Sequence, residues 1–279
     1  MSVKIIIDST ADLMPAVKAR CKVVPLTVHF GEEEYIDGVT ISHKEFYEKL
    51  VETDVMPSTS QANPEAFDKV FREVSANGDS AVVITIASGL SGTCQSANIA
   101  AADYDNIHVI DSGTAAIGAG ILSEYALQLA DKGMDAASIA KELNAVKGRI
   151  HVIALVDTLE YLCKGGRLSK TAAVAGGILN IKPVLAINQG EIKVLGKARG
   201  SKQANNLLAS EIEKAGGVDF DMPLLLGYTG LSNALLVKYI EDSKQLWEDS
   251  RAQLNSTIIG SVIGTHAGPG AVAVAFFRK

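Results

Sequence analysis

The sequence predicts an α/β protein of two domains, and two observations support this fold class. In the first half of the chain, short β-branched runs alternate with longer stretches of helical apolar spacing, which is typical of a doubly wound, mainly parallel sheet. From about Arg149 onward, predicted strands follow one another through short turns, which favours a mixed or antiparallel sheet. We therefore expect an N-terminal α/β domain over residues 1–148 and a C-terminal α/β domain over residues 149–279.

The elements of the first half follow from residue type and spacing. Strands are predicted where apolar and β-branched residues cluster, at 4–7, 23–30, 81–86 and 107–110. Helices are predicted at 42–52, 64–76, 93–102, 115–131 and 135–146. Ser42 and Asn63 precede two of these helices as N-caps, and Pro64 suits a first helical turn because no intrahelical partner awaits its missing N–H.

The second half begins with a strand at 149–157 and a short helix that ends at Gly165 and Gly166. Two strands within 181–199 flank Asn188-Gln189-Gly190, which is a hairpin signal. A helix at 201–215, a strand at 223–228 and helices at 231–243 and 244–253 follow. We expect residues 256–279 to form two strands that flank a Gly/Pro turn.

Composition limits the classes of partner. The chain has 279 residues, of which 47% are hydrophobic and 21% charged, as in a well-buried globular protein. A net charge of -6 without a basic tract makes nucleic acid an unfavoured partner. The longest apolar runs fall short of the ~18 residues of a membrane span, so none is expected. The three cysteines lie far apart and the N-terminal apolar run meets Asp8 at once, so we expect a reducing, cytoplasmic location.

Several familiar kinds of site lack their motifs. No GxxxxGK[ST] phosphate loop occurs, and in "SGLSGT" the second glycine comes one place too early for a G-x-S-x-G nucleophile elbow. The five histidines have neither HExxH nor HxH spacing, so no metal site is predicted. We therefore expect no metal and no catalytic constellation.

The loop "SGLSGT", residues 88–93, follows a predicted strand and precedes a predicted helix. Its glycines permit close backbone approach to a ligand, and Ser91 or Thr93 would stand at the helix N-terminus, where free N–H groups favour an anion. An ordinary hydroxyl N-cap in a tight turn explains the loop equally well. On this loop alone the two interpretations stay open.

Three further polar loops end predicted elements. "STSQ" contains Thr59 and Ser60, "KGGRLS" places Arg167 after two glycines, and "GTHAGPG" places His266 in a turn. Each has an ordinary structural explanation: a polar connection, a helix C-cap with a solvated arginine, and a turn histidine. Together they are polar loops at element ends, where the sites of α/β proteins gather.

The motifs "IIIDSTADL", "STSQ", "SGLSGT", "LEYLCKGGRLS", "IKPVL" and "GTHAGPG", in this order, resemble those of the DegV family over nearly the whole chain. The resemblance implies two α/β domains, the C-terminal one lipid-binding, and a bound long-chain fatty acid without any cofactor. It also implies a carrier that is not itself an enzyme. As the fatty-acid-binding subunit of a bacterial fatty acid kinase, it would present its ligand to a separate kinase subunit.

The resemblance also implies where the fatty acid's carboxylate would bind. The expected ligands are Thr59 and Ser60, Ser91 with the backbone of Gly92, and His266, with Arg167 in the same polar network. Thr93, at the start of the helix that follows the loop "SGLSGT", is also an expected ligand. The stretch "GKARGSKQAN", with Lys197, Arg199 and Lys202, departs from the family's more basic pattern, so no docking residue for a kinase subunit is predicted.

An acyl chain needs an apolar tunnel, and the C-terminal half contains suitable apolar runs, among them "LLLGY" and "AVAVAFF". Burying ~16 carbons at roughly 0.8 kcal/mol each could contribute about 12 kcal/mol before ordering costs. Small residues could leave room for a slender chain, and core packing explains them equally well: Ala172, Ala173, Ala175, Gly176 and Gly177.

An alternative function stays open at this point. A serine-based hydrolase or phosphotransferase could use Ser91 as nucleophile and His266 as base, with Asp8 or Asp111 as the third group. Hydroxyl-rich loops and a histidine are compatible with such chemistry. The missing nucleophile elbow counts against it.

Overall fold

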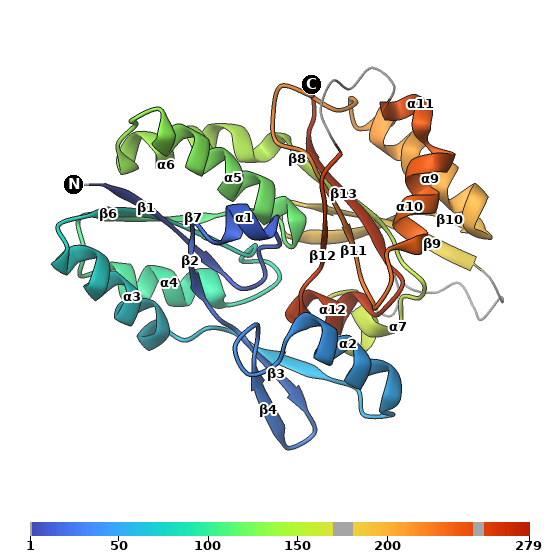
Figure 1. The fold of residues 1–279 in the computed structure, drawn as a ribbon, viewed down its shortest axis with the longest axis horizontal. Helices are drawn as coiled ribbons and strands as arrows, with labels where there is room; N and C mark the ends of the chain where they lie inside the picture. The colour runs from blue at the N-terminus through green and yellow to red at the C-terminus, as the bar shows by residue number, and fades with distance from the viewer. Residues whose placement is uncertain (1, 170–180, 248–253) are drawn as a thin grey trace.

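The computed structural model describes residues 2–169, 181–247 and 254–279. In these ranges the strands form a four-stranded, a six-stranded and a three-stranded sheet (Figure 1). The four-stranded sheet is parallel and the six-stranded sheet is mixed, so the predicted α/β fold class is confirmed. The division into two domains near residue 148 stays a prediction.

The parallel sheet is covered by helices on both faces. Its spatial order is β2 (Lys22–Val24), β1 (Val3–Asp8), β6 (Ser80–Thr85) and β7 (Ile107–Asp111). One face packs against α3 (Pro64–Ala76) and α4 (Thr93–Ala101), the other against α5 (Ile117–Asp131) and α6 (Ala136–Val146). Because side chains alternate along a strand, Ile6 of β1 joins the first core and Ile5 and Ile7 join the second.

Local capping explains where two helices begin. The Ser42 hydroxyl accepts a hydrogen bond from the Glu45 backbone N–H at 3.3 Å. In return, the Glu45 carboxylate accepts from the Ser42 backbone N–H at 2.8 Å, which completes a capping box before α2 (His43–Glu52). Asn63 caps α3 through the Ala66 backbone N–H at 2.9 Å. Both helix starts were predicted from the sequence.

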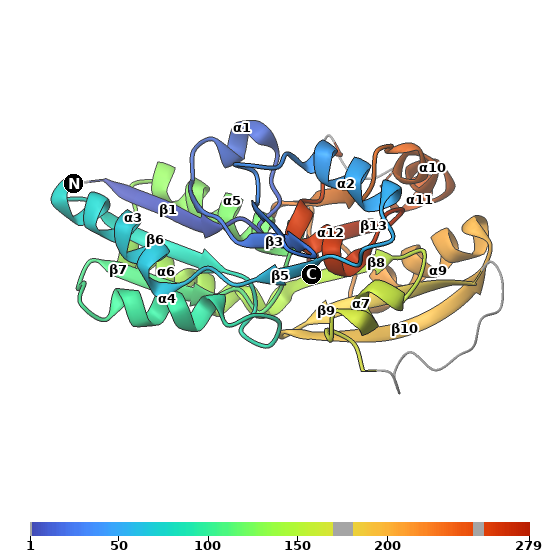
Figure 2. The ribbon, with the colours of Figure 1, turned by 90° about the horizontal axis from the view of Figure 1, so that it is seen from below.

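The six-stranded sheet carries most of the C-terminal half. Its order is β10 (Glu191–Arg199), β9 (Ile181–Asn188), β8 (Ile150–Leu155), β13 (Val272–Phe277), β11 (Leu225–Tyr228) and β12 (Ser256–Ile258). The core on one face includes residues of α9 (Ser201–Lys214), α10 (Ala234–Asp242) and α11 (Lys244–Trp247). The opposite face looks toward the four-stranded sheet and α5 (Figure 2). Of the predicted helix at 244–253, residues 248–253 lie outside the described residues.

A small antiparallel sheet corrects two predictions. It consists of β4 (Glu33–Ile36), β3 (Thr27–Phe30) and β5 (Ser58–Ser60). The single strand predicted at 23–30 is two strands in two sheets, separated at Pro25, whose missing N–H cannot serve a ladder. The polar connection expected around residue 59 is instead the edge strand β5, paired with β3.

The predicted pair of strands at 256–279 is wrong in its middle part. Ser261–Ala267 form the helix α12 between β12 and β13, and Gly268, with φ of 71°, follows it. Gly264 lets this helix lie against α2, because a Cβ there would stand 2.5 Å from Tyr47 Oη and 2.8 Å from Phe46 Cε1. His266 therefore lies in the last turn of a helix and not in a strand-to-strand turn.

The parallel and mixed sheets share part of one core. Ile5 and Ile7 of β1 belong to the same cluster of buried side chains as Ala275 and Phe277 of β13, and α5 lies between the two strands. This packing brings the carboxyl ends of β1, β6 and β7 near the inner face of the six-stranded sheet (Figure 2). Among the described residues, no helix is long and apolar enough to cross a membrane.

Candidate functional site: an apolar cavity with a polar end

A cavity of about 400 Å³ lies between the inner face of the six-stranded sheet, α12 and the loops that follow the parallel strands. Its volume is within the usual range for small-molecule sites, ~300–1,000 Å³. Val152 and Ala154 of β8 line it, as does Val156 just after that strand, and Leu185 and Ile187 of β9 also line it. The cavity wall therefore follows the two-residue period of the sheet.

Small residues make the middle of this wall shallow. Leu185, Ala154, Ala273 and Gly227 are paired in one row across β9, β8, β13 and β11. Ala154 and Ala273 line the cavity, and their methyl groups leave space above the sheet. The small residues predicted to make such room, at 172–177, lie outside the described residues. The wall alanines were not singled out from the sequence.

The polar end of the cavity collects the predicted loop residues. Thr59 comes from β5, Ser91 and Gly92 from the turn before α4, Arg167 from the turn after α7 (Glu160–Lys164), and His266 from α12. All of them line the same cavity, as does Ser60. Thus segments far apart in sequence place hydroxyl, imidazole and guanidinium groups at one place.

Thr59 and His266 form the central polar pair. Thr59 Oγ1 and His266 Nε2 lie 2.9 Å apart, and either can donate, depending on the imidazole tautomer. His266 Nδ1 is buried and has no hydrogen-bond partner among the described residues. Burial, together with the smaller effect of the positive charge of Arg167, lowers the pKa of His266 to about 4. At neutral pH the imidazole is therefore uncharged, with one ring nitrogen a donor and the other an acceptor.

Ser91 is supported from behind by Thr93. Their side-chain oxygens are 2.9 Å apart, and the Thr93 backbone N–H donates to Ser91 Oγ at 3.3 Å. Thr93 is fully buried and is not among the cavity-lining residues, so it stands one layer back from the cavity. The hydroxyl of Ser60 lies 2.8 Å from His29 Nε2. That Thr93 and Ser60 bind the carboxylate of a ligand directly stays a prediction.

Arg167 joins two loops. Its Nε–H donates to the carbonyl oxygen of Leu90 at 3.2 Å, and Nη1–H donates to that of Gly165 at 2.8 Å. The guanidinium lines the apolar cavity and also a second, more polar cavity of about 460 Å³ that includes Gly89 and Lys193. It therefore stands between the polar end of the apolar cavity and the second cavity.

Gly165 lies against the imidazole of His266, although from the sequence it was predicted only to end a helix. A Cβ at this position would lie 2.3 Å from His266 Nδ1 and 3.0 Å from the carbonyl oxygen of Tyr161. We expect Gly165→Ala to displace the imidazole and weaken ligand binding roughly tenfold, about the loss of one buried hydrogen bond to a charged group. Titration calorimetry against Gly148→Ala, where a Cβ meets nothing within 4 Å, provides the comparison. Equal affinities would show that the imidazole position is unimportant.

The depressed pKa of His266 predicts acid sensitivity. Its folded pKa lies below its unfolded value, so the folded state binds this proton less readily. Stability from this group is full above about pH 6.5 and falls by up to about 3 kcal/mol as the pH drops through about 4. Urea unfolding at several pH values should show this loss in the wild type and a smaller one in His266→Gln. Parallel pH profiles would contradict the assignment.

Among the described residues, no hydrogen bonds connect Ser91, His266 and an aspartate in the way that a serine-based enzyme needs. The hydrogen bond of Ser91 goes to Thr93, and that of His266 goes to Thr59. Asp8 accepts from Thr10 and from the Ile86 backbone N–H, and Asp111 accepts from Ser88 and Gly113. In the described ranges, no group of three His, Cys, Asp or Glu side chains could hold a metal ion.

The fold and the site define an α/β protein whose apolar cavity ends in neutral hydroxyl and imidazole groups beside an arginine. A family model for the DegV family, described as uncharacterised proteins, matches residues 2–279. A DegV domain-containing protein of Caldanaerobacter subterraneus subsp. tengcongensis is 37% identical, covering 92% of this chain and 91% of that protein. The chain belongs to the DegV family.

Solved structures agree with this assignment. A DegV family protein from Thermus thermophilus, described by its fatty acid binding, superposes with a TM-score of 0.87 at 29% identity, covering 99% of this chain and 100% of that chain. A stearic acid-binding protein from Eubacterium ventriosum has a TM-score of 0.87 at 28% identity, covering 100% and 99%. DegV from Bacillus subtilis, described as a fatty acid binding protein, has a TM-score of 0.82 at 30% identity, with complete coverage of both chains.

Proposed function

We propose that the protein binds one long-chain fatty acid, with its acyl chain in the apolar cavity and its carboxylate at the polar end. The observation that carries this proposal is a cavity of about 400 Å³ whose apolar wall ends at Thr59, Ser91, Arg167 and His266. Related DegV proteins described as binding fatty acids support the ligand class.

The chemistry of both ends suits such a ligand. A buried carboxylate needs hydrogen-bond donors, and the polar end has them in the Ser91 and Thr59 hydroxyls and the Gly92 backbone, with the neutral imidazole in contact with Thr59. Arg167 adds a positive charge beside these groups. Along the chain, burial of ~16 carbons contributes roughly 12 kcal/mol before ordering costs. The acyl chain therefore supplies most of the affinity, and the polar end selects the head group.

A comparison of palmitate with hexadecanol tests the proposal. The two have the same number of carbons in an unbranched chain, and only palmitate has the carboxylate that accepts several hydrogen bonds. We expect palmitate to bind at least roughly tenfold more tightly, since hydrogen bonds to charged groups exceed neutral ones. In Ser91→Ala this preference should shrink. Equal affinities of the wild type for the two ligands would show that the protein does not recognise the carboxylate.

We propose further that the protein is a carrier that presents its fatty acid to a separate kinase subunit. The second cavity beside Arg167 supports this by providing a polar approach to the head-group end. Incubation of the loaded protein with a candidate kinase subunit and ATP should yield acyl phosphate, and omission of either should not. Triple alanine substitution of Lys197, Arg199 and Lys202 tests whether this basic stretch contributes to docking. The cytoplasmic location stays a prediction.

The carrier proposal also implies that the protein does not turn over esters by itself. Incubation with an activated acyl ester should give no burst of released alcohol in the wild type. A burst that Ser91→Ala abolishes would replace the carrier function with a serine-based enzyme.

A further inference from the structure

The segment that carries His266 is also a wall of the cavity. Ile259, Val262, Ile263, His266 and Ala267 all line it, and they belong to α12 and the residues just before it. Any displacement of this segment changes the polar end and the apolar wall together. The groups that hold its other side therefore control the geometry of both.

Residues from the first fifty positions hold that other side. The Asp12 carboxylate accepts from the Gly260 backbone N–H at 2.9 Å, directly before α12. Tyr47 Oη–H of α2 donates to the carbonyl oxygen of Ile259 at 2.8 Å. Behind them, Gly264 lies against the Tyr47 ring, where no Cβ would fit. The start of α12 is thus fixed by two polar contacts from distant segments.

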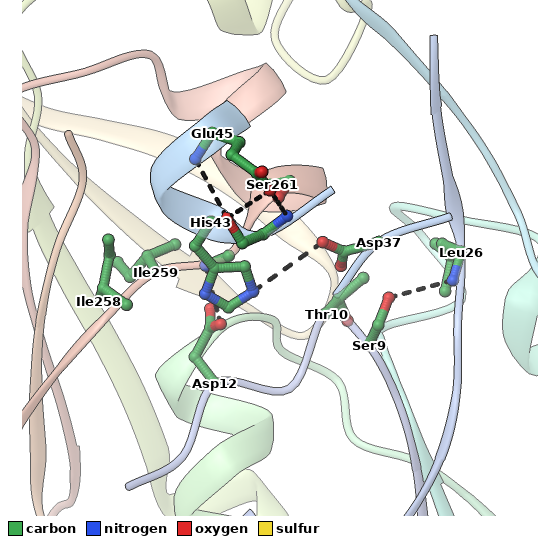
Figure 3. A network of polar contacts seen from close by, with 12 residues as sticks. Ser9, Thr10, Asp12, Leu26, Asp37, His43, Glu45, Ile258, Ile259 and Ser261 are labelled. Carbon is green, nitrogen blue, oxygen red and sulfur yellow. Dashed lines mark hydrogen bonds and ion pairs between the residues drawn. The ribbon is translucent and has the colours of Figure 1, made fainter. Parts of the chain in front are cut away.

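Asp12 belongs to a buried acidic junction. Figure 3 shows its carboxylate beside His43 of α2, with Asp37 on the other side of the imidazole. Asp12 is 2% exposed and Asp37 is 3% exposed, and His43 Nε2 lies 3.9 Å from Asp37 Oδ1. Asp12 Oδ2 and both Asp37 oxygens have no hydrogen-bond partner among the described residues. Buried carboxylates with free oxygens cost stability, so this arrangement is not explained by folding alone.

We propose that Asp12 is a positioning residue for fatty acid binding: its carboxyl group holds the start of α12 and thereby places His266 and the cavity wall. This inference rests on the proposed function for its ligand. Tyr47 acts with Asp12, because its hydroxyl holds the neighbouring carbonyl of the same segment.

The protonation of Asp12 makes this hold dependent on pH. Burial raises the pKa of Asp12 to about 7, while the charge of Lys18 and the Gly260 N–H oppose the rise. The titratable groups that face it come from β1, α1 (Pro15–Lys18), the segment after β4, and α2: Asp8, Lys18, Asp37, His43 and Tyr47. Above about pH 7 the ionised carboxylate holds Gly260 by a charge-assisted bond, which is stronger than a neutral one.

The same titration affects stability in the opposite direction. The folded pKa lies above the unfolded one, so the stability contribution of Asp12 is full below about pH 4 and is lost as the pH rises through about 7. The pKa of Asp135, an exposed carboxylate that caps α6, is instead lowered by its hydrogen bonds from Ser138. Asp12→Asn should therefore raise the melting temperature above about pH 7, because it removes a buried charge and keeps an acceptor for Gly260.

Palmitate affinity of Asp12 variants tests the proposal. We expect Asp12→Ala to bind palmitate at least roughly tenfold more weakly, and Asp12→Asn to bind within about threefold of the wild type. The wild type should lose affinity relative to Asp12→Asn as the pH falls through about 7. The control is Asp135→Ala, which also removes an aspartate from a helix start, that of α6, and should leave affinity unchanged. Wild-type affinity in Asp12→Ala would overturn the proposal.

Two additions keep the test decisive. Tyr47→Phe keeps the packed ring and removes only the bond to Ile259, so it replaces Asp12→Ala if that variant does not fold. The ¹⁵N resonances of the His266 ring report its position without any ligand. They should shift in Asp12→Ala and not in Asp135→Ala, and no shift would overturn the proposal. If wild-type protein binds no palmitate, the proposed function fails, and the ring resonances still decide whether Asp12 places His266.

Discussion

Replacing Ala273 with leucine is expected to weaken palmitate binding by roughly 50-fold. The Ala273 side chain lines the cavity and is paired with that of Ala154 across the shallow middle of the sheet wall. Leucine would fill space equivalent to about three methylene groups of the ligand, and each is worth about 0.8 kcal/mol of burial. The loss should be smaller for a fatty acid shorter by about three carbons, so the preferred chain length should fall. Titration calorimetry with a chain-length series measures both effects.

The matched control for this variant is Ala186→Leu. Ala186 lies on β9 between Leu185 and Ile187, which line the cavity, so its side chain is on the opposite face of the same sheet. Overpacking costs roughly 1–3 kcal/mol of stability at either position. Only Ala273→Leu should change the chain-length preference. A uniform loss across all chain lengths would mean that the row of small residues does not form the chain's path.

The second large effect is expected from His266→Ala. This variant removes the partner of Thr59 from the polar end, and leaves the apolar wall in place. We expect palmitate affinity to fall roughly 10- to 100-fold, the cost of losing a hydrogen bond to a buried charged group. Hexadecanol affinity should change less. Circular dichroism at neutral pH should show a folded protein, because a neutral, partly buried imidazole contributes little to the core.

His29→Ala provides the comparison. His29 Nε2 also lies 2.8 Å from a hydroxyl, that of Ser60, but the imidazole itself does not line the cavity. This variant should bind palmitate as the wild type does. If both variants lose palmitate affinity equally, or if neither loses it, His266 has no specific role in binding the carboxylate.

The sequence predicted most elements of the fold because their signals are local. Ser42 and Glu45 form the capping box of α2, and Asn63 with Pro64 starts α3, all within four residues of the helix start. The alternation of apolar strands with helices was enough to predict the parallel sheet. The edge strand β5 was missed because a three-residue polar segment has no apolar alternation, and only its pairing with β3 makes it a strand.

The helix α12 could not be predicted in this way, since its determinants are distant. The segment around Gly264 is apolar and β-branched, which locally favours a strand, and its glycines have a low helix propensity. Its helical form depends on Asp12, which accepts from Gly260, and on packing against Tyr47. Such contacts join positions more than two hundred residues apart, and no periodicity of the sequence reports them.

The candidate site was predictable in its residues but not in its geometry. The polar loops were identified singly, and the pair of Thr59 and His266 appears only once strand β5 meets α12. Gly165 was read as a helix end, although its missing side chain is what admits the imidazole. The alanines of the wall had a usable signal: Ala271, just before the last strand, and Ala273, within it, alternate with valines, which marks one face as small.

Native mass spectrometry of the purified protein shows whether the cavity holds a fatty acid. We expect a stoichiometric adduct that organic extraction identifies as a fatty acid of roughly 14 to 20 carbons, the length such a cavity can bury. His266→Ala should retain less of it than His29→Ala. A protein that is purified empty, and that also takes up no added palmitate, would rule out fatty acid binding and favour Ser91 as a nucleophile.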